Sequence, residues 1–326
     1  MQLNEKLFLA GNLDKPEKIA TRDGLGKALV EAGEKNESLV VLSADLAEST
    51  RAQWFGDKFP ERFFQCGVAE QNMMAVAAGL GLDGKTAVAT SFSVFSPGRN
   101  WDQVRISVCY NESNVKICST HSGITVGGDG ATHEALEDIA STRVLPKMRV
   151  LVPCDFWEAK KATLAAIAAP GPFYVRYGRE KMPVITTEQT PFEIGKAYVF
   201  KEGSDVAIIA NGFMVFEALV AAKELEETGV SAAVVNLPTV KPIDSKMLEQ
   251  IARKCGAVVS AEDHQIHGGV GSAIAESLAK TYPVPQEFVG MQDCFGESGT
   301  AQELMKKYGM TRVEIKAAAK KVLKRK

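Results

Sequence analysis

The sequence has little of several features that would define a special class of protein. Its 326 residues contain six cysteines, four histidines and 7% aromatic residues, and no two cysteines form a C-x-x-C pair. No apolar run reaches the length of about 18 residues that a membrane-spanning helix needs. The start, MQLNEKLFLAGN, lacks the basic and apolar regions of a signal peptide. These absences argue against a disulfide scaffold and a membrane protein, and they favour reduced thiols in a cytoplasmic protein.

The chain also lacks an excess of either charge. Lysine and arginine number 38 against 40 aspartates and glutamates, which gives a net charge of −2. Such a balance creates no general field that would attract nucleic acid or an anionic membrane. Apolar residues make up 45% of the chain, so it can bury a large core. Its length fits two α/β domains.

From Ile19 onwards, short apolar runs alternate with stretches of helical periodicity. The expected strands include LVVLSAD, FFQCG, TAVATSF, VKICSTH, MRVLVP and FYVRYG. Helical spacing appears in RDGLGKALVEAGEK, EQNMMAVAAGL, RNWDQVRISVCYN, EALEDIAS and FWEAKKATLAAIA. This alternation predicts an α/β fold with parallel sheets covered on both faces.

Residues 179–195 interrupt this rhythm with two prolines and little periodicity, so we interpret them as a linker. We therefore expect an N-terminal arm over 1–18, a first α/β domain over 19–178 and a second parallel-sheet α/β domain over 196–326. No short-period repeat is present.

Polar and aromatic side chains collect where the expected strands of the first domain end, which is where open α/β sheets place ligands. A purely structural sheet does not need this set of side chains. They are, in chain order, Asp45, Glu70, Phe92, Phe95, His121, Asp129, His133, Arg176 and Arg179.

Several motifs around these residues occur in a familiar order. They are GVAEQNMMAVAAGLGLDG, then TSFSVF, then THSGITVGGDGATHEALEDIA. With these motifs the chain resembles the pyrimidine-binding and C-terminal parts of transketolase, from about Ile19 to the end. The resemblance implies an enzyme that uses thiamine diphosphate and moves a two-carbon ketol unit between ketose and aldose phosphates.

Glu70 is the central residue of this resemblance. Thiamine diphosphate reacts at its C2 carbon after its own 4'-amino group becomes basic, and this requires a protonated carboxyl that hydrogen-bonds N1' of the pyrimidine. The resemblance gives that role to Glu70. Without its neighbours, Glu70 would also fit as a first-turn glutamate that complements a helix dipole.

The same resemblance assigns the rest of the cofactor pocket. Phe92 and Phe95 match residues that pack on the pyrimidine ring, for which aromatic faces are suited. Asp45 and Leu46 match a segment that contacts the cofactor near its thiazolium. Gly98 stands where some transketolases carry a further aromatic residue.

The substrate pocket is implied in the same way. His121, Asp129 and His133 match residues that bind sugar hydroxyls, with His121 and His133 close to the reacting atoms. Arg22, Ser49 and Arg179 match the phosphate-binding set, and a guanidinium suits phosphate well. Arg176 lies three residues before Arg179, and the sequence does not decide which of the two faces the site.

Two glycine-rich segments are not assigned to catalysis. Thiamine-diphosphate enzymes hold Mg²⁺ with GDG followed by an asparagine, but no asparagine occurs here between Gly130 and Asn211. We therefore interpret GGDG as a turn that presents Asp129 and expect no metal site in this chain. The segment EDHQIHGGVG could bind an anion, but a structural turn and subunit contact is the preferred interpretation.

The domain that grips the diphosphate and Mg²⁺ is missing from the resemblance. We therefore expect a separate N-terminal subunit that holds Mg²⁺, in a heterotetramer. The alternatives are the β subunit of a 2-oxoacid dehydrogenase, a relative of 1-deoxyxylulose-phosphate synthase, a split transketolase for sulfosugars or branched sugars, and a non-catalytic scaffold subunit.

Overall fold

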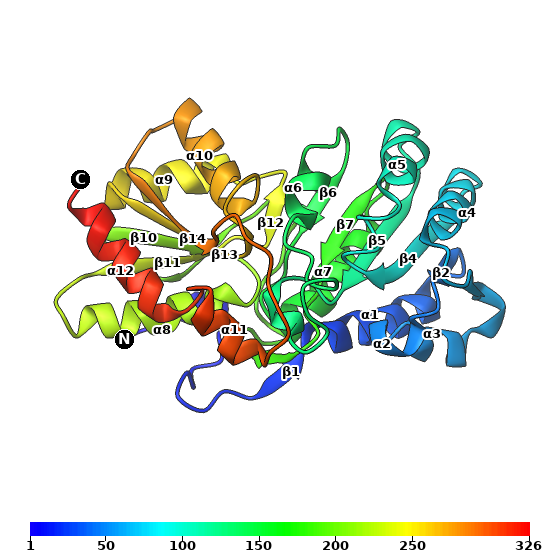
Figure 1. Ribbon diagram of the computed structural model, residues 1–326, viewed down its shortest axis with the longest axis horizontal. Coiled ribbons are helices and arrows are strands. Elements are labelled where there is room, and N and C mark those ends of the chain that lie inside the picture. Colours follow the sequence, from blue (N-terminus) through cyan, green and yellow to red (C-terminus); the bar gives the residue numbers. More distant parts are fainter.

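The computed structural model describes residues 1–326 as two α/β units that lie side by side (Figure 1). Each unit has a mainly parallel sheet with helices on its faces, which confirms the predicted α/β class. All six cysteines are free. No helix combines the length and apolar character that crossing a bilayer requires.

The first sheet has seven strands in the order β12-β6-β7-β5-β4-β2-β3. Every residue of β2, β4 and β5 is buried, as expected for parallel strands covered on both faces. The bounds are β2 Leu39–Ser43, β3 Phe63–Gln65, β4 Thr86–Phe92, β5 Val115–Thr120, β6 Arg149–Leu151, β7 Phe173–Arg176 and β12 Thr239–Lys241.

Helices α1 and α7 pack on one face of this sheet, and α4 and η3 pack on the other. A Cβ on Gly24 of α1 would lie 2.6 Å from the carbonyl oxygen of Phe156, so only glycine permits this close approach of α1 to α7. The helices are α1 Thr21–Lys35, α2 Ala47–Thr50, α3 Gln53–Lys58, α4 Glu70–Leu82, α5 Trp101–Gln103, α6 Asp138–Arg143 and α7 Phe156–Ala168. The remaining turns are 3-10 helices η1 Glu5–Leu7, η2 Pro60–Arg62 and η4 Ile124–Val126.

The stretch RNWDQVRISVCYN, predicted as helical, is helical over Trp101–Tyr110, but most of it has another winding than the α-helix. Only Trp101–Gln103 is α-helical, and η3, Val104–Tyr110, is a π-helix. Apolar spacing cannot distinguish these two windings over so few residues.

The second sheet has the order β14-β13-β10-β11-β9, with β9 antiparallel to β11. Its strands are β9 Tyr198–Lys201, β10 Val206–Ala210, β11 Ala232–Asn236, β13 Val258–Gln265 and β14 Gln286–Met291. Its helices are α8 Met214–Glu226, α9 Ser245–Cys255, α10 Val270–Lys280, α11 Ala301–Lys307 and α12 Arg312–Leu323. Both α11 and α12 begin with a capping box, which fixes their first residues.

Three short strands that the sequence did not reveal lie at the borders of the two units, and one of them links the second half of the chain to the first sheet. β8, Lys181–Pro183, lies within the predicted linker and pairs with β1, Lys18–Ala20. β12 comes from the second half of the chain but pairs with β6 at the edge of the first sheet. The N-terminal arm also contacts the second unit, because the amide of Asn4 donates to the carbonyl of Phe200 over 2.9 Å.

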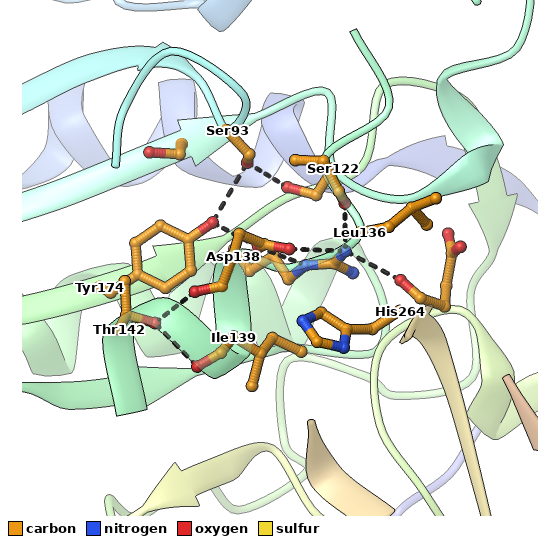
Figure 2. A network of polar contacts seen from close by, with 12 residues as sticks. Ser93, Ser122, Leu136, Asp138, Ile139, Thr142, Tyr174 and His264 are labelled. Carbon is orange, nitrogen blue, oxygen red and sulfur yellow. Dashed lines mark hydrogen bonds and ion pairs between the residues drawn. The ribbon is translucent and has the colours of Figure 1, made fainter. Parts of the chain in front are cut away.

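A buried polar network joins the two units (Figure 2). Asp138 of α6 accepts hydrogen bonds from the Tyr174 hydroxyl at 2.5 Å and from Nε of Arg176 at 2.7 Å. Nη2 of Arg176 also donates to the carbonyl of Asp263 on β13 over 2.8 Å. Burial alone would raise the pKa of Asp138, but the charge and hydrogen bonds of Arg176 bring that pKa below its ordinary value. Arg176 therefore ties β7 to the second unit.

Candidate active site

Glu70 is the first residue of α4, at the carboxyl edge of the first sheet. Only 1% of its side chain is exposed. Nη1 of Arg99 donates to Oε2 of Glu70 over 2.7 Å, and the Asn100 amide donates to the backbone carbonyl of Glu70 over 3.2 Å. The segment after β4 thus holds both the backbone and the carboxylate of Glu70.

Four side-chain rings cluster beside Arg99, which is the hydrogen-bond partner of Glu70. The ring of Phe92 stacks on His121 with centroids 3.7 Å apart, and Phe95 lies 6.1 Å from Phe92. His133 presents an edge to Phe95 at 5.4 Å. The guanidinium carbon of Arg99 lies 4.6 Å from the centre of the Phe95 ring. Glu70, which follows β3, is therefore brought together with residues from the ends of β4 and β5.

His121 stacks on Phe92 within this cluster and is buried. Its backbone is left-handed, with φ +57°, and its Nδ1 is 2.9 Å from the Thr120 hydroxyl. Burial, followed by the positive charges of Arg22 and Arg179, lowers the pKa of His121 to about 3. The imidazole therefore stays neutral at ordinary pH and can serve as a hydrogen-bonding group.

Three arginines form a cationic group near His121, and each donates to a backbone carbonyl. Nη1 of Arg22 bonds Ser49 at 2.9 Å, Nη1 of Arg51 bonds Glu48 at 3.1 Å, and Nη1 of Arg179 bonds Val126 at 2.7 Å. Arg22 Nε is buried and has no partner, which leaves a donor for an anionic ligand. Burial, followed by the charge of Arg51, lowers the pKa of Arg22.

Arg51 was not identified from the sequence. It follows Ser49 by two residues and adopts a left-handed backbone with φ +69°. Its Nε donates to Asp23 over 2.7 Å, so part of its charge is already paired. Its place beside Ser49 in the chain was the one signal that could have suggested it.

The sequence did not decide which of Arg176 and Arg179 faces the site, and the structure gives the two arginines different contacts. Arg176 donates hydrogen bonds to Asp138 and to backbone carbonyls at the junction of the two units. Arg179 belongs to the cationic group, and its Nη2 lies 3.9 Å from Oδ1 of Asp129. Asp129 is carried by the GGDG turn, in which Gly127 and Gly130 have φ of +79° and +77°.

Asp45 and Leu46 lie in the loop after β2. Asp45 is exposed, and its left-handed backbone, φ +59°, turns the chain towards α2. The Asp45 amide donates to Oε1 of Gln65 over 3.3 Å, which ties this loop to the end of β3. Leu46 is half-buried at the start of α2.

Comparison with known proteins identifies the family of the two units. Residues 17–184 match the family model described as transketolase, pyrimidine binding domain, and residues 195–315 match the transketolase C-terminal domain. The chain belongs to the transketolase family.

Similar transketolase-family proteins include separate subunits of about the same extent. A putative transketolase C-terminal section of Methanocaldococcus jannaschii is 46% identical, over 89% of this chain and 92% of that protein. A 6-deoxy-6-sulfo-D-fructose transketolase subunit of Clostridium sp. (strain MSTE9) is 42% identical, over 94% and 95%. A solved structure titled split gene transketolase, inactive beta4 tetramer, is 48% identical with a TM-score of 0.88, over 94% of this chain and 99% of that chain.

The residues around Glu70 suit the aminopyrimidine of the transketolase cofactor. A buried carboxyl at the edge of an aromatic cluster offers one polar contact and apolar ring faces, which a flat polar heterocycle needs.

In the loop EDHQIHGGVG of this transketolase-family chain, the glycine-rich amides already bind a carboxyl group of the chain itself. Oε2 and Oε1 of Glu262 accept from the amides of Val270 and Gly271 over 2.6 and 2.8 Å, at the start of α10. These amides are thus satisfied within the fold, which agrees with the interpretation of the loop as a structural turn.

Glu134, next to His133, is a buried carboxyl of which neither oxygen has a hydrogen-bond partner. Its Oε2 lies against Gly296 in the loop before α11. Burial, followed by the charges of Asp263 and Glu297, raises the pKa of Glu134 from 4.5 to about 7. The pKa of Glu134 is therefore higher in the folded state than in the unfolded state. Ionisation of Glu134 then lowers the free energy of unfolding as pH rises from about 4.5 to about 7.

Replacing Glu134 with glutamine removes this titration and preserves the shape of the side chain. We expect the Tm of Glu134→Gln to exceed that of the wild type at pH 8, with a smaller difference at pH 5. Thermal melts of both proteins at the two pH values measure this, with exposed Glu37→Gln as the control. An equal difference at both pH values would contradict the assignment.

Proposed function

We propose that this chain is the subunit of a split transketolase that activates thiamine diphosphate through Glu70. The assembled enzyme would transfer a two-carbon ketol unit between ketose and aldose phosphates, in the pentose phosphate pathway of the cytoplasm. The observation that carries the proposal is the buried Glu70 carboxyl at the edge of the Phe92, Phe95, His121 and His133 ring cluster.

The cofactor supplies a nucleophilic carbon that accepts and releases the ketol unit. The role of this chain is to prepare the cofactor. Glu70, protonated, would donate to N1' of the pyrimidine, while Phe92 and Phe95 hold the ring. Asp45 and Leu46 would contact the cofactor nearer its thiazolium.

The sugar would lie between the ring cluster and the cationic group. Neutral His121, with His133 and Asp129, would hydrogen-bond the sugar hydroxyls close to the reacting carbon. Arg22, Ser49 and Arg179 would bind the phosphate, and the unpartnered Nε of Arg22 supports this. Arg51 adds a third guanidinium beside them.

An exposed apolar surface supports the proposed partner subunit. Val68, just before α4, and Tyr110 of η3 are 72% and 82% exposed, and further exposed apolar side chains lie on α4 and η3. This surface runs along α4 and η3, at the end of the molecule away from the second unit (Figure 1). Its further members are Val76, Leu82 and Ile106. Because it borders Glu70, a partner covering it would meet the cofactor site.

The partner would carry the diphosphate-binding domain and hold Mg²⁺, in a heterotetramer of two copies of each chain. Since both the diphosphate and the metal would rest on that partner, this chain alone should bind the cofactor weakly. The 48%-identical split gene transketolase was solved as an inactive beta4 tetramer, which is consistent with a β chain that needs a partner.

Assembly with the partner provides the test. We expect this chain, mixed with the product of a neighbouring transketolase N-terminal gene, Mg²⁺ and thiamine diphosphate, to convert xylulose and ribose phosphates into a seven-carbon sugar phosphate. Either chain alone should give no product, and mass spectrometry detects the difference. Tight Mg²⁺-dependent cofactor binding by this chain alone would contradict the split arrangement.

A second donor is favoured by one observation. The 42%-identical Clostridium subunit is named for a sulfonated fructose, and a sulfonate is an anion that the same arginines could bind. The same assay should therefore include 6-deoxy-6-sulfo-D-fructose. Formation of product from this donor and not from xylulose phosphate would assign the enzyme to sulfosugars. Pyruvate as the only donor would instead point to the synthase or dehydrogenase alternatives.

A further inference from the structure

Arg99 makes two contacts of different kinds in the candidate cofactor pocket. Its Nη1 donates to the buried Oε2 of Glu70 over 2.7 Å. Its guanidinium carbon lies 4.6 Å from the centre of the Phe95 ring. One planar group thus meets both the carboxyl and an aromatic ring that the proposed function gives to the pyrimidine.

A guanidinium and an aminopyrimidine share the features that this pocket recognises. Both are flat and nitrogen-rich, and both can lie on an aromatic ring while sharing a hydrogen bond with a carboxyl. We propose that Arg99 occupies the pyrimidine position in the cofactor-free subunit and competes with the cofactor for Glu70. This inference rests on the proposed function of Glu70.

The charge states of the two arrangements exclude each other. Arg99 is always cationic and pairs best with an ionised Glu70. The proposed role of Glu70 requires a protonated carboxyl that donates to N1'. Binding of the cofactor therefore has to expel the guanidinium, as a cation, from Glu70, and the carboxylate has to take up one proton from solvent.

The local structure allows this movement. Two hydrogen bonds fix the segment that carries Arg99: the Arg99 backbone amide donates to the Phe95 carbonyl over 2.9 Å, and the Asn100 side-chain amide donates to the Ser96 hydroxyl over 3.1 Å. The Arg99 side chain is nevertheless 48% exposed. It can swing into solvent without disturbing the backbone around Glu70.

The contact between Arg99 and Glu70 also compensates a buried charge in the cofactor-free subunit. An ionised Glu70 without a partner would be a buried, uncompensated charge, which is costly. Arg99 neutralises it until the cofactor arrives. The consequence is a lower apparent affinity for the cofactor, because only the fraction of molecules with Arg99 displaced can bind.

The test compares cofactor affinity in the assembled complex of both subunits. If Arg99 covers the site in about nine molecules of ten, Arg99→Gln should bind thiamine diphosphate about tenfold more tightly. Arg99→Lys keeps the charge but loses the planar group, so its affinity should lie between those of Arg99→Gln and the wild type. Calorimetric titration with Mg²⁺ present gives the Kd values, and exposed Arg253→Gln is the matched control.

Unchanged or weaker binding by Arg99→Gln, in a complex that melts as a folded protein, would overturn the inference. Glu70→Gln separates this outcome from failure of the proposed function. If Glu70→Gln abolishes turnover while Arg99→Gln leaves the Kd unchanged, only the competition is wrong. If Glu70→Gln leaves both turnover and the Kd unchanged, the role proposed for Glu70 is wrong as well.

Discussion

Glu70→Ala should lower turnover of the assembled enzyme by a factor of about a hundred to ten thousand, the usual contribution of a group that controls proton transfer. Without a carboxyl at N1', the amino group of the cofactor would not become basic. The loss should appear in kcat at saturating cofactor, because the diphosphate would still be held by the partner. Steady-state assays with xylulose and ribose phosphates measure it.

Glu37→Ala is the matched control, since Glu37 is exposed and lies outside the candidate site. Its turnover should equal that of the wild type. Retention of most activity by Glu70→Ala would favour the scaffold alternative, in which the chain has the fold but not the chemistry. Circular dichroism of the variant complex distinguishes a chemical loss from unfolding.

Arg176→Met should destabilise the chain by about 3–5 kcal/mol, because it leaves the carboxylate of Asp138 buried without its charge partner. Arg176 also donates to carbonyls at Ala135 and Asp263, so the junction of the two units would lose several hydrogen bonds together. Urea denaturation followed by tryptophan fluorescence gives the free energy of unfolding.

Arg179→Met offers a control three residues away. Arg179 is partly exposed, and its ion pair with Asp129 spans 3.9 Å, so its loss should cost less than about 1 kcal/mol of stability. It should instead raise the KM for sugar phosphates. Equal destabilisation by the two substitutions would contradict the separate roles that the structure gives to Arg176 and Arg179.

The fold of the first unit could be predicted from local patterns. β2, β4 and β5 are short stretches rich in apolar and β-branched residues, and α1, α4 and α7 follow at helical spacing, so each element is visible within its own residues. Glu70 could be placed at a helix start for the same reason. The family resemblance then grouped residues that lie far apart in the chain.

The contacts that the sequence could not predict depend on distant partners. β1, β8 and β12 have three residues each, which is too short for a recognisable pattern, and they form only because their partners are brought beside them. The hydrogen bond between Arg99 and Glu70 spans 29 positions, and that between Arg176 and Asp138 spans 38. Neither leaves a signal in composition or periodicity.

The position of β12 has a practical consequence for dividing this protein. Cutting the chain within residues 179–195 would separate Thr239–Lys241 from the sheet that it completes. β6 would then become an open edge, with backbone groups free to pair with other molecules. A fragment made in this way should aggregate, so fusions and fluorescent tags belong at the chain ends and not at that internal boundary.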